Sequence, residues 1–130
     1  MDLPQPGISP EGIPCVPVTL SRDSETQDVL VVYTSKTGIY WDMPLADFEK
    51  EPLAPAAPEP VFTVPLAKFQ HFKGTTYKVV CRVRDPRTLE NRLVYENPEG
   101  ARWVRSEAMF MEEVEWPDGV RRARFVFVEG

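Results

Sequence analysis

The sequence is poor in the side chains that enzymes most often use for catalysis. Its 130 residues include one histidine, His71, and two cysteines, Cys15 and Cys81, which lie far apart in the chain. These residues form neither a metal-ligand spacing nor a redox cysteine pair, and no nucleophile with a matching base is visible near His71. We therefore predict no catalytic residues, no metal ligands and no cofactor, and we expect a protein that is not an enzyme.

Long apolar segments are missing as well. No run of 18 apolar residues occurs, so no segment has the length and composition of a transmembrane helix. Residues 1–6 lack the basic and apolar regions of a secretory signal, from which we expect a cytoplasmic protein that does not bind membranes. In that compartment, Cys15 and Cys81 are expected to be buried free thiols rather than a disulfide.

Proline, by contrast, is abundant, with 14 residues. Because proline lacks a backbone N–H and fixes φ, it interrupts helices and central strands, and long helices are not expected. The densest group falls in residues 52–60, where four prolines in nine residues predict a stiff, polyproline-like connector.

Charge is divided unevenly between the two halves of the chain. Residues 1–65 contain 3 Lys and Arg against 10 Asp and Glu, whereas residues 66–130 contain 12 against 10. The two sums, −7 and +2, give the net charge of −5. The first half should repel nucleic acid, and the second half is only mildly basic.

The sequence contains an internal repeat. When the chain is shifted by 62 residues without gaps, residues 12–51 match residues 74–113 at 12 of 40 positions, where unrelated sequences would share about two or three. The matched positions include turn glycines, an Arg-Asp pair and large aromatic residues, among them Trp41 with Trp103. We therefore interpret the two segments as copies of one module.

Each copy is predicted to be a small β module. In the second copy, alternation and turn chemistry predict strands over 77–84, 91–96 and 101–105, then a helical turn over 106–111 with Ser106 as its N-cap. A hairpin of residues 111–116 and 120–128 follows. In the first strand, Tyr77, Val79, Cys81 and Val83 are expected on one face. The first copy repeats the plan with strands near 16–20, 29–34 and 40–41 and a turn over 35–38, and it lacks the hairpin.

The fold class that follows is mainly β. Five short strands in about 60 residues indicate an SH3-like barrel, so we predict two tandem small SH3-like β-barrel modules with short helical turns. The first module takes residues 1–51, a Pro-rich linker residues 52–65, and the second module residues 66–130. A unit of this size buries a marginal core, so we expect the copies to pack together with pseudo-two-fold symmetry; the alternative is two beads on a linker.

The second copy carries an ordered set of motif residues, namely His71-Phe72-Lys73-Gly74, Tyr77, Thr88, Val94-Tyr95, Trp103-Val104-Arg105, Met109-Phe110 and Arg124-Phe125. In order and spacing this set resembles the domain-of-unknown-function family numbered 1653, a bacterial and phage family of small β domains, over about residues 68–127. The resemblance implies an SH3-like size and strand content and brings no activity. The first copy has Ser9-Pro10-Glu11-Gly12 where the second has His-Phe-Lys-Gly, so we interpret it as degenerate.

The candidate binding surface lies in the second copy and consists of His71, Lys73, Tyr77, Trp103 and Arg105. Arg105 is two residues beyond Trp103 on the same face of a predicted strand, and SH3-like modules read peptides with exposed aromatic residues. The competing interpretations are structural. His71 would then bond the turn at Gly74, and the two tryptophans would be core residues or would pack between the copies.

Three functional hypotheses remain open at this point. The leading one is an interaction module that binds a protein or peptide partner, as a monomer or weak dimer. The alternative is nucleic-acid binding through the arginines of the second half, interleaved with Tyr77, Tyr95 and Trp103; these arginines can equally form a solvated, salt-bridged strand face. A small hydrolase or nucleotide-modifying enzyme that uses His71 is the least favoured hypothesis.

Overall fold

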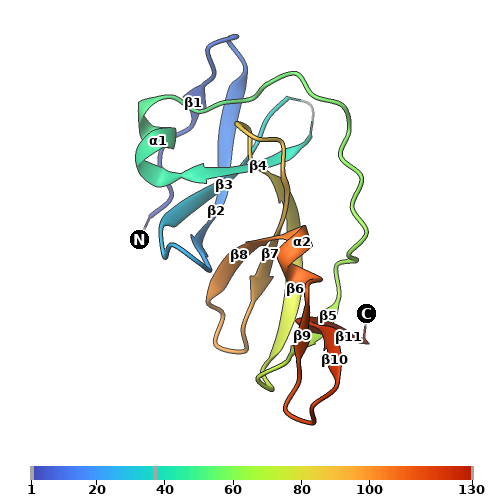
Figure 1. The fold of residues 1–130 in the computed structure, drawn as a ribbon. Helices are drawn as coiled ribbons and strands as arrows, with labels where there is room; N and C mark the ends of the chain where they lie inside the picture. The colour runs from blue at the N-terminus through green and yellow to red at the C-terminus, as the bar shows by residue number, and fades with distance from the viewer. Residues whose placement is uncertain (1, 37, 130) are drawn as a thin grey trace.

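The protein is mainly β, with short helices between its strands (Figure 1). The structure, a computed structural model, describes residues 2–36 and 38–129. Three residues lie outside the described part: Met1 and Gly130, at the ends of the predicted modules, and Thr37, in the turn predicted over 35–38. The strands are β1 (Gly7–Ile8), β2 (Pro14–Asp23), β3 (Val29–Thr34), β4 (Tyr40–Pro44), β5 (Lys68–His71), β6 (Thr76–Arg84), β7 (Asn91–Glu96), β8 (Arg102–Ser106), β9 (Glu113–Glu115), β10 (Arg121–Ala123) and β11 (Phe125–Glu129). The helices are α1 (Leu45–Lys50) and α2 (Glu107–Phe110).

Six strands close into one barrel. Their order is β6-β4-β3-β2-β8-β7, and β7 pairs again with β6 to complete the ring. Four of the six contacts are antiparallel, and the two parallel contacts, β2 with β8 and β4 with β6, join strands from different halves of the chain. Figure 1 shows the strands of the first half in the upper part of the molecule and most of the second half below them.

The expectation of one barrel in each module needs correction. The first half supplies β2, β3 and β4 to the ring and the second half supplies β6, β7 and β8, so neither half closes a barrel by itself. Three strands bury only one face of a sheet and leave two open edges. Sharing one ring pairs those edges and buries the apolar residues between them, and the two halves therefore pack together rather than lie apart.

Elements in the two halves correspond at the same spacing of 62 residues. Strand β3 begins and ends 62 residues before β7, and β4 begins and ends 62 residues before β8. The strand predictions over 29–34 and 91–96 are confirmed. The inter-half contacts are reciprocal, because Arg22 pairs with Trp103 and Arg84 pairs with Trp41.

The turns correspond in the same way. The Oδ1 atom of Asp23 accepts the backbone N–H of Thr26 at 3.0 Å, and Oδ1 of Asp85 accepts the N–H of Thr88 at 3.4 Å. Each turn also places one residue in the left-handed region, Gln27 at φ 69° and Leu89 at φ 63°. The Arg-Asp-x-x-Thr pattern therefore builds the same turn twice.

A β-bulge changes which residues of β6 face inward. The register with β7 shifts between Val79 and Cys81, and a bulge moves the following side chains to the other face. Val79 belongs to the core of the second half, with Tyr77 packed against it, whereas Val83 lies in the centre of the barrel with Cys81 beside it. The prediction of a single face is wrong, because strict alternation cannot include the extra residue.

The segment after β8 follows the prediction only in part. Ser106 caps α2, since its Oγ accepts the backbone N–H of Met109 at 3.1 Å, as expected. The final hairpin is shorter than predicted. Only β9 and β10 pair with each other, and β11 crosses to pair antiparallel with β5 at the end of the sheet.

The buried apolar residues form three clusters. The central one fills the barrel and consists of Leu30, Val32, Val83, Val94 and Val104. The cluster of the first half contains Cys15, Val31, Tyr33, Trp41, Met43, Phe48 and Ala54. The cluster of the second half contains Val64, Ala67, Phe69, Val79, Leu93, Tyr95, Phe110 and Phe125.

The Pro-rich connector runs along the outside of the barrel (Figure 1). It forms no helix or strand between Glu51 and Val64. Side chains from the second half donate hydrogen bonds to its backbone carbonyl groups. Arg84 donates to the carbonyl of Pro58 at 2.9 Å, and Arg82 donates to that of Val64 at 3.0 Å. The connector therefore has fixed contacts along its length.

Candidate functional site

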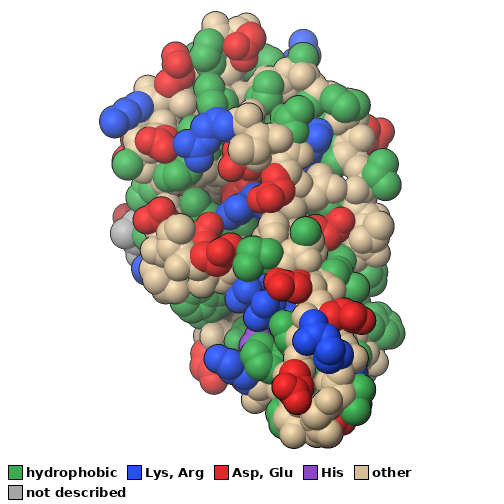
Figure 2. All heavy atoms as spheres, in the orientation of Figure 1, with side chains coloured by type: hydrophobic (Ala, Val, Ile, Leu, Met, Phe, Trp, Pro, Cys, Tyr) green, Lys and Arg blue, Asp and Glu red, His purple; other side chains and the backbone are tan. Residues whose placement is uncertain are grey.

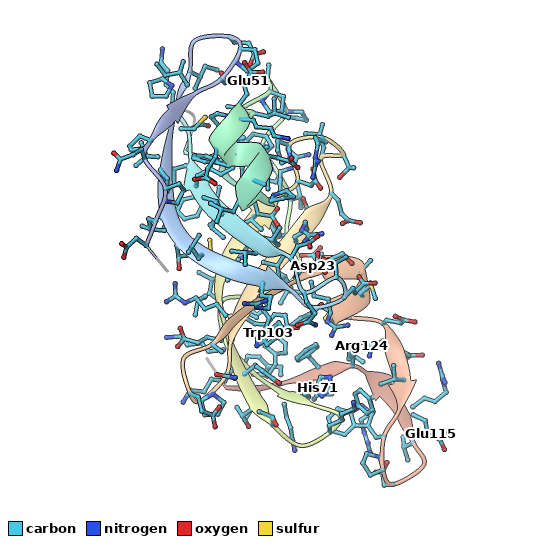
Figure 3. The ribbon with its side chains drawn as sticks, turned by 90° about the vertical axis from the view of Figure 1, so that its left-hand side faces the viewer. Asp23, Glu51, His71, Trp103, Glu115 and Arg124 are labelled. Atoms are coloured by element: carbon cyan, nitrogen blue, oxygen red, sulfur yellow. The ribbon has the colours of Figure 1, made fainter. Side chains whose placement is uncertain are left out.

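The five residues of the predicted binding surface line one cavity of about 300 Å³, here called the His71 cavity. Its complete lining is Ser24, Gln27, His71, Lys73, Thr75, Tyr77, Tyr95, Trp103, Arg105 and Phe125. Figure 3 shows His71 and Trp103 on the same side of the molecule, below Asp23. The cavity therefore lies where the turn after β2 of the first half meets β5–β8 and β11 of the second half.

The His-Phe-Lys-Gly element is the turn between β5 and β6. Gly74 has φ 107°, a conformation that side-chain-bearing residues rarely adopt, and its N–H donates to the carbonyl of His71 at 2.8 Å. The N–H of Lys73 donates to Nδ1 of His71 at 3.2 Å. The predicted structural role of His71 in this turn is therefore present in the geometry, and the same turn places the imidazole at the cavity.

Aromatic rings form one wall of the cavity. Phe125 stacks on the buried Phe110 with ring centroids 4.0 Å apart, and its other neighbours include His71 at 4.8 Å and Tyr95 at 5.2 Å. Tyr77 meets Tyr95 edge-on at 5.2 Å. Because each ring is held by another, the wall is preorganised for an apolar or flat group.

The charged side chains around His71 are positive. Lys73 and Arg105 line the cavity, and Arg124 lies close by, paired with Glu112 at 3.3 Å. Burial, followed by the positive charges of Arg105, Arg124 and Lys73, lowers the pKa of His71 to about 4. His71 is therefore neutral at physiological pH. Since Nδ1 accepts a hydrogen bond, the proton is on Nε2.

The cationic surroundings of the histidine are visible on the outside of the molecule. Figure 2 shows the histidine between Lys and Arg side chains in the lower part of the protein. Arg105 makes one weak hydrogen bond, from Nε to the hydroxyl of Tyr95 at 3.4 Å, and lies over the ring of Phe125. None of the ten lining residues is an Asp or Glu.

The two repeated tryptophans have different environments. Trp41 is a core residue with 1 % of its surface exposed, and its Nε1 donates to Oγ of Ser35 at 3.2 Å. Trp103 is partly buried, borders the His71 cavity and makes no hydrogen bond through its indole N–H within residues 2–36 and 38–129. The core interpretation holds for Trp41, and Trp103 combines packing with a place at the cavity.

The position in the first half that corresponds to the His71 cavity is filled by apolar side chains. Shifting by 62 residues replaces Arg105 by Met43, which is buried against the hydroxyl of Tyr33 at 3.3 Å. Leu89, the counterpart of Gln27, packs into the same core, and Leu53 of the connector also fills it. A closed apolar core thus stands where the second half has an open, cationic cavity, so the barrel does not require the cavity.

Sequence reasoning missed half of the lining. Tyr95 and Phe125 belong to the motif set described above, and that membership could have marked them as site residues. Ser24 and Gln27 had no such signal. They come from the turn of the other half, and only the parallel pairing of β2 with β8 brings that turn to the cavity.

The nine arginines of the second half that were considered for nucleic-acid binding mostly serve the fold. Five of them form ion pairs with carboxylates: Arg87, Arg92, Arg102, Arg122 and Arg124. Arg82 and Arg84 bind the connector. This arrangement matches the salt-bridged strand face and leaves little continuous basic surface.

No group of three or more His, Cys, Asp or Glu side chains in the described part of the chain could hold a metal ion. Within the same residues, no helix is long and apolar enough to cross a bilayer.

Comparison with known proteins gives one match. Neither the curated proteins nor the solved structures provide a match to this chain. The model of one family covers residues 67–127, which include the His-Phe-Lys-Gly turn, β6–β8 and Phe125. The resemblance inferred from the motif residues is thereby confirmed: residues 67–127 match the family described as "Protein of unknown function (DUF1653)".

Proposed function

We propose that the protein is a non-enzymatic binding module whose His71 cavity holds one residue of a protein or peptide partner. The observation that carries the proposal is the difference between the halves. Equivalent positions form a closed core in the first half and, in the second, an open cavity whose polar lining includes His71, Lys73 and Arg105. Because the fold is stable with the place filled, the open cavity calls for a functional reason.

The size of the cavity supports a partner that inserts a small group. About 300 Å³ is at the lower end of the range for ligand pockets. That volume suits one side chain or a chain terminus better than a whole cofactor. The aromatic wall and the half-buried Trp103 provide the kind of rigid contact surface that interaction hot spots use.

The absence of an assembled acid–base pair also favours binding over catalysis. His71 is held neutral, its Nδ1 is already occupied by the N–H of Lys73, and none of the described residues that line the cavity is an Asp or Glu. A general base needs a free acceptor nitrogen and a proton source within hydrogen-bond reach.

A duplicated unit is the second part of the proposal. We infer that residues 12–51 and 74–113 descend from one repeat, in which the first copy lost the His-Phe-Lys-Gly element. The matching strand bounds, the two Asp turns and the reciprocal pairs Arg22 with Trp103 and Arg84 with Trp41 support this. In this view the first copy completes the barrel and the second copy binds.

A peptide-display selection against the whole protein tests the binding function. Selected peptides are expected to bind the wild type and to lose at least about tenfold in affinity for the variant Trp103→Ala/Arg105→Met, by fluorescence anisotropy. The methionine copies Met43 of the first half, so it fits the local backbone. Lys78→Met is the matched control, because Lys78 is exposed on β6 and does not line the cavity.

Two results would overturn the assignment. One is a selection that yields no binder. The other is a set of peptides that binds the double variant as tightly as the wild type while circular dichroism shows the fold intact. A gel shift with single-stranded and double-stranded RNA and DNA tests the nucleic-acid alternative, for which affinity should fall steeply with salt.

A further inference from the structure

The donors around the His71 cavity come from separate elements and point to one ligand chemistry. Lys73 stands in the β5–β6 turn and Arg105 in β8. Neither side chain forms an ion pair with a described carboxylate: Lys73 lies over the ring of Phe72 at 5.7 Å, and Arg105 over that of Phe125 at 5.9 Å. Two cations at one cavity without a counter-charge repel each other and favour an anion.

Two further N–H donors border the cavity. With Nδ1 engaged by the turn, His71 offers its Nε2–H, and Trp103 offers an indole N–H. The hydroxyl and amide groups of the lining can donate as well as accept, whereas a cationic group would be repelled by Lys73 and Arg105. An oxygen-rich anion would receive several charge-assisted hydrogen bonds.

We propose that the His71 cavity recognises an oxyanion, a carboxylate or phosphate group carried by the partner, held between Lys73 and Arg105 with its apolar body against Phe125 and Tyr77. The proposal rests on the proposed function only in taking the cavity as the binding site. It is specific to the second half, because the first half has Glu11 and Met43 at the positions of Lys73 and Arg105.

The direction of the His71 pKa supports the same assignment. Burial is its first cause, and Arg105, Arg124 and Lys73 all add to the decrease. Of these cations, Arg124 is paired with Glu112, and the other two have no paired carboxylate among the described residues. A bound anion would offset their charge and raise the pKa of His71.

Titration by NMR tests the inference, because His71 is the only histidine and gives a single set of imidazole signals. Phenyl phosphate and benzoate are added to the whole protein at pH 7.5, with phenol and benzylamine as neutral and cationic probes of similar shape. Both anions, or phenyl phosphate alone, are expected to shift the imidazole signals and to raise the pKa of His71 by roughly one unit or more. Binding of phenyl phosphate alone would identify a phosphate group, and binding of both would identify either oxyanion.

Variants separate the cavity from the general surface. Arg105→Met is expected to weaken binding of phenyl phosphate by roughly tenfold to a hundredfold, and Lys78→Met, which removes the same charge elsewhere, to leave it unchanged. Equal binding of phenol or benzylamine would overturn the oxyanion assignment. So would shifts that persist in Arg105→Met, or binding of a short oligonucleotide without binding of phenyl phosphate. None of these results would affect the peptide selection, which tests the binding function separately.

Discussion

The substitution Arg92→Leu tests the polar connection inside the barrel. Arg92 of β7 donates through Nε to Oδ2 of Asp42 at 2.9 Å and through Nη2 to Oδ2 of Asp23 at 3.0 Å. Both aspartates belong to the first half and Arg92 belongs to the second, so these two ion pairs connect the halves across the ring. Asp42 has 3 % of its surface exposed, and its Oδ1 has no hydrogen-bond partner within the described residues.

The expected loss of stability follows from the buried carboxyl group that the substitution leaves unpaired. Without Arg92 the carboxyl group of Asp42 is buried with no cation beside it, and breaking such a pair costs about 3–5 kcal/mol. A domain of this size has a total stability of about 5–15 kcal/mol. The melting temperature should therefore fall by roughly 10–20 °C.

The pH dependence of the loss has a definite sign. Burial, only partly offset by Arg92, raises the pKa of Asp42 to about 7. Between about pH 4 and 7 the folded state therefore binds more protons than the unfolded state at Asp42, so this contribution to stability falls as pH rises. Removing Arg92 raises the pKa of Asp42 further, so the fall, whose slope for one group is at most about 1.4 kcal/mol per pH unit, should continue above pH 7 in the variant, where it levels off in the wild type.

Comparison with the wild type isolates this effect from His71. The folded pKa of His71 lies below its ordinary value of 6.5, so its contribution runs in the opposite direction and stability rises with pH between about 4 and 6.5. Because His71 is present in both proteins, the difference between their stability curves reports Asp42. Urea unfolding followed by circular dichroism between pH 4 and 8 measures both curves.

The chain itself supplies the rescue variant. The counterparts of Arg92 and Asp42 in the other half are Leu30 and Val104, both buried in the centre of the barrel. The double variant Arg92→Leu/Asp42→Val should recover most of the lost stability and, because it lacks the carboxyl group, show no continued fall above pH 7. If the double variant were no more stable than Arg92→Leu, the buried charge would not be the cause of the loss.

Three further predictions concern the core, the turns and the thiols. Phe125→Ala should cost about 3–5 kcal/mol in urea unfolding, because the ring is 1 % exposed and stacks on Phe110; a loss below 1 kcal/mol would contradict this packing. Asp85→Ala should cost about 1 kcal/mol through the lost bond to the N–H of Arg87, 2.8 Å away, and an unchanged melting curve would exclude that role. Both thiols should react with Ellman's reagent only after denaturation, since Cys15 is buried and burial raises the pKa of Cys81 to about 11; rapid reaction of the native protein would refute their placement.

Local patterns in the sequence determined most of the strands, the turns and half of the lining of the candidate site. Alternating apolar residues identify residues 29–34 and 91–96 as strands, and an Asp before a turn bonds its own backbone wherever the turn lies. The family motif concentrates on the β5–β6 turn and β8, which is why His71, Lys73, Tyr77, Trp103 and Arg105 were found together.

Long-range pairing is what only the tertiary structure decided. The sequence contains the same strands whether each half closes alone or both share one ring, because local periodicity carries no information about which edges meet. The parallel contacts of β2 with β8 and β4 with β6 settle that choice. They bring Gln27 to the His71 cavity and Leu89 to the filled core of the first half. Gln27 thus borders an open cavity, whereas its counterpart Leu89 packs in a closed apolar core. The burial of each turn residue depends on which side chains of the opposite half lie next to it.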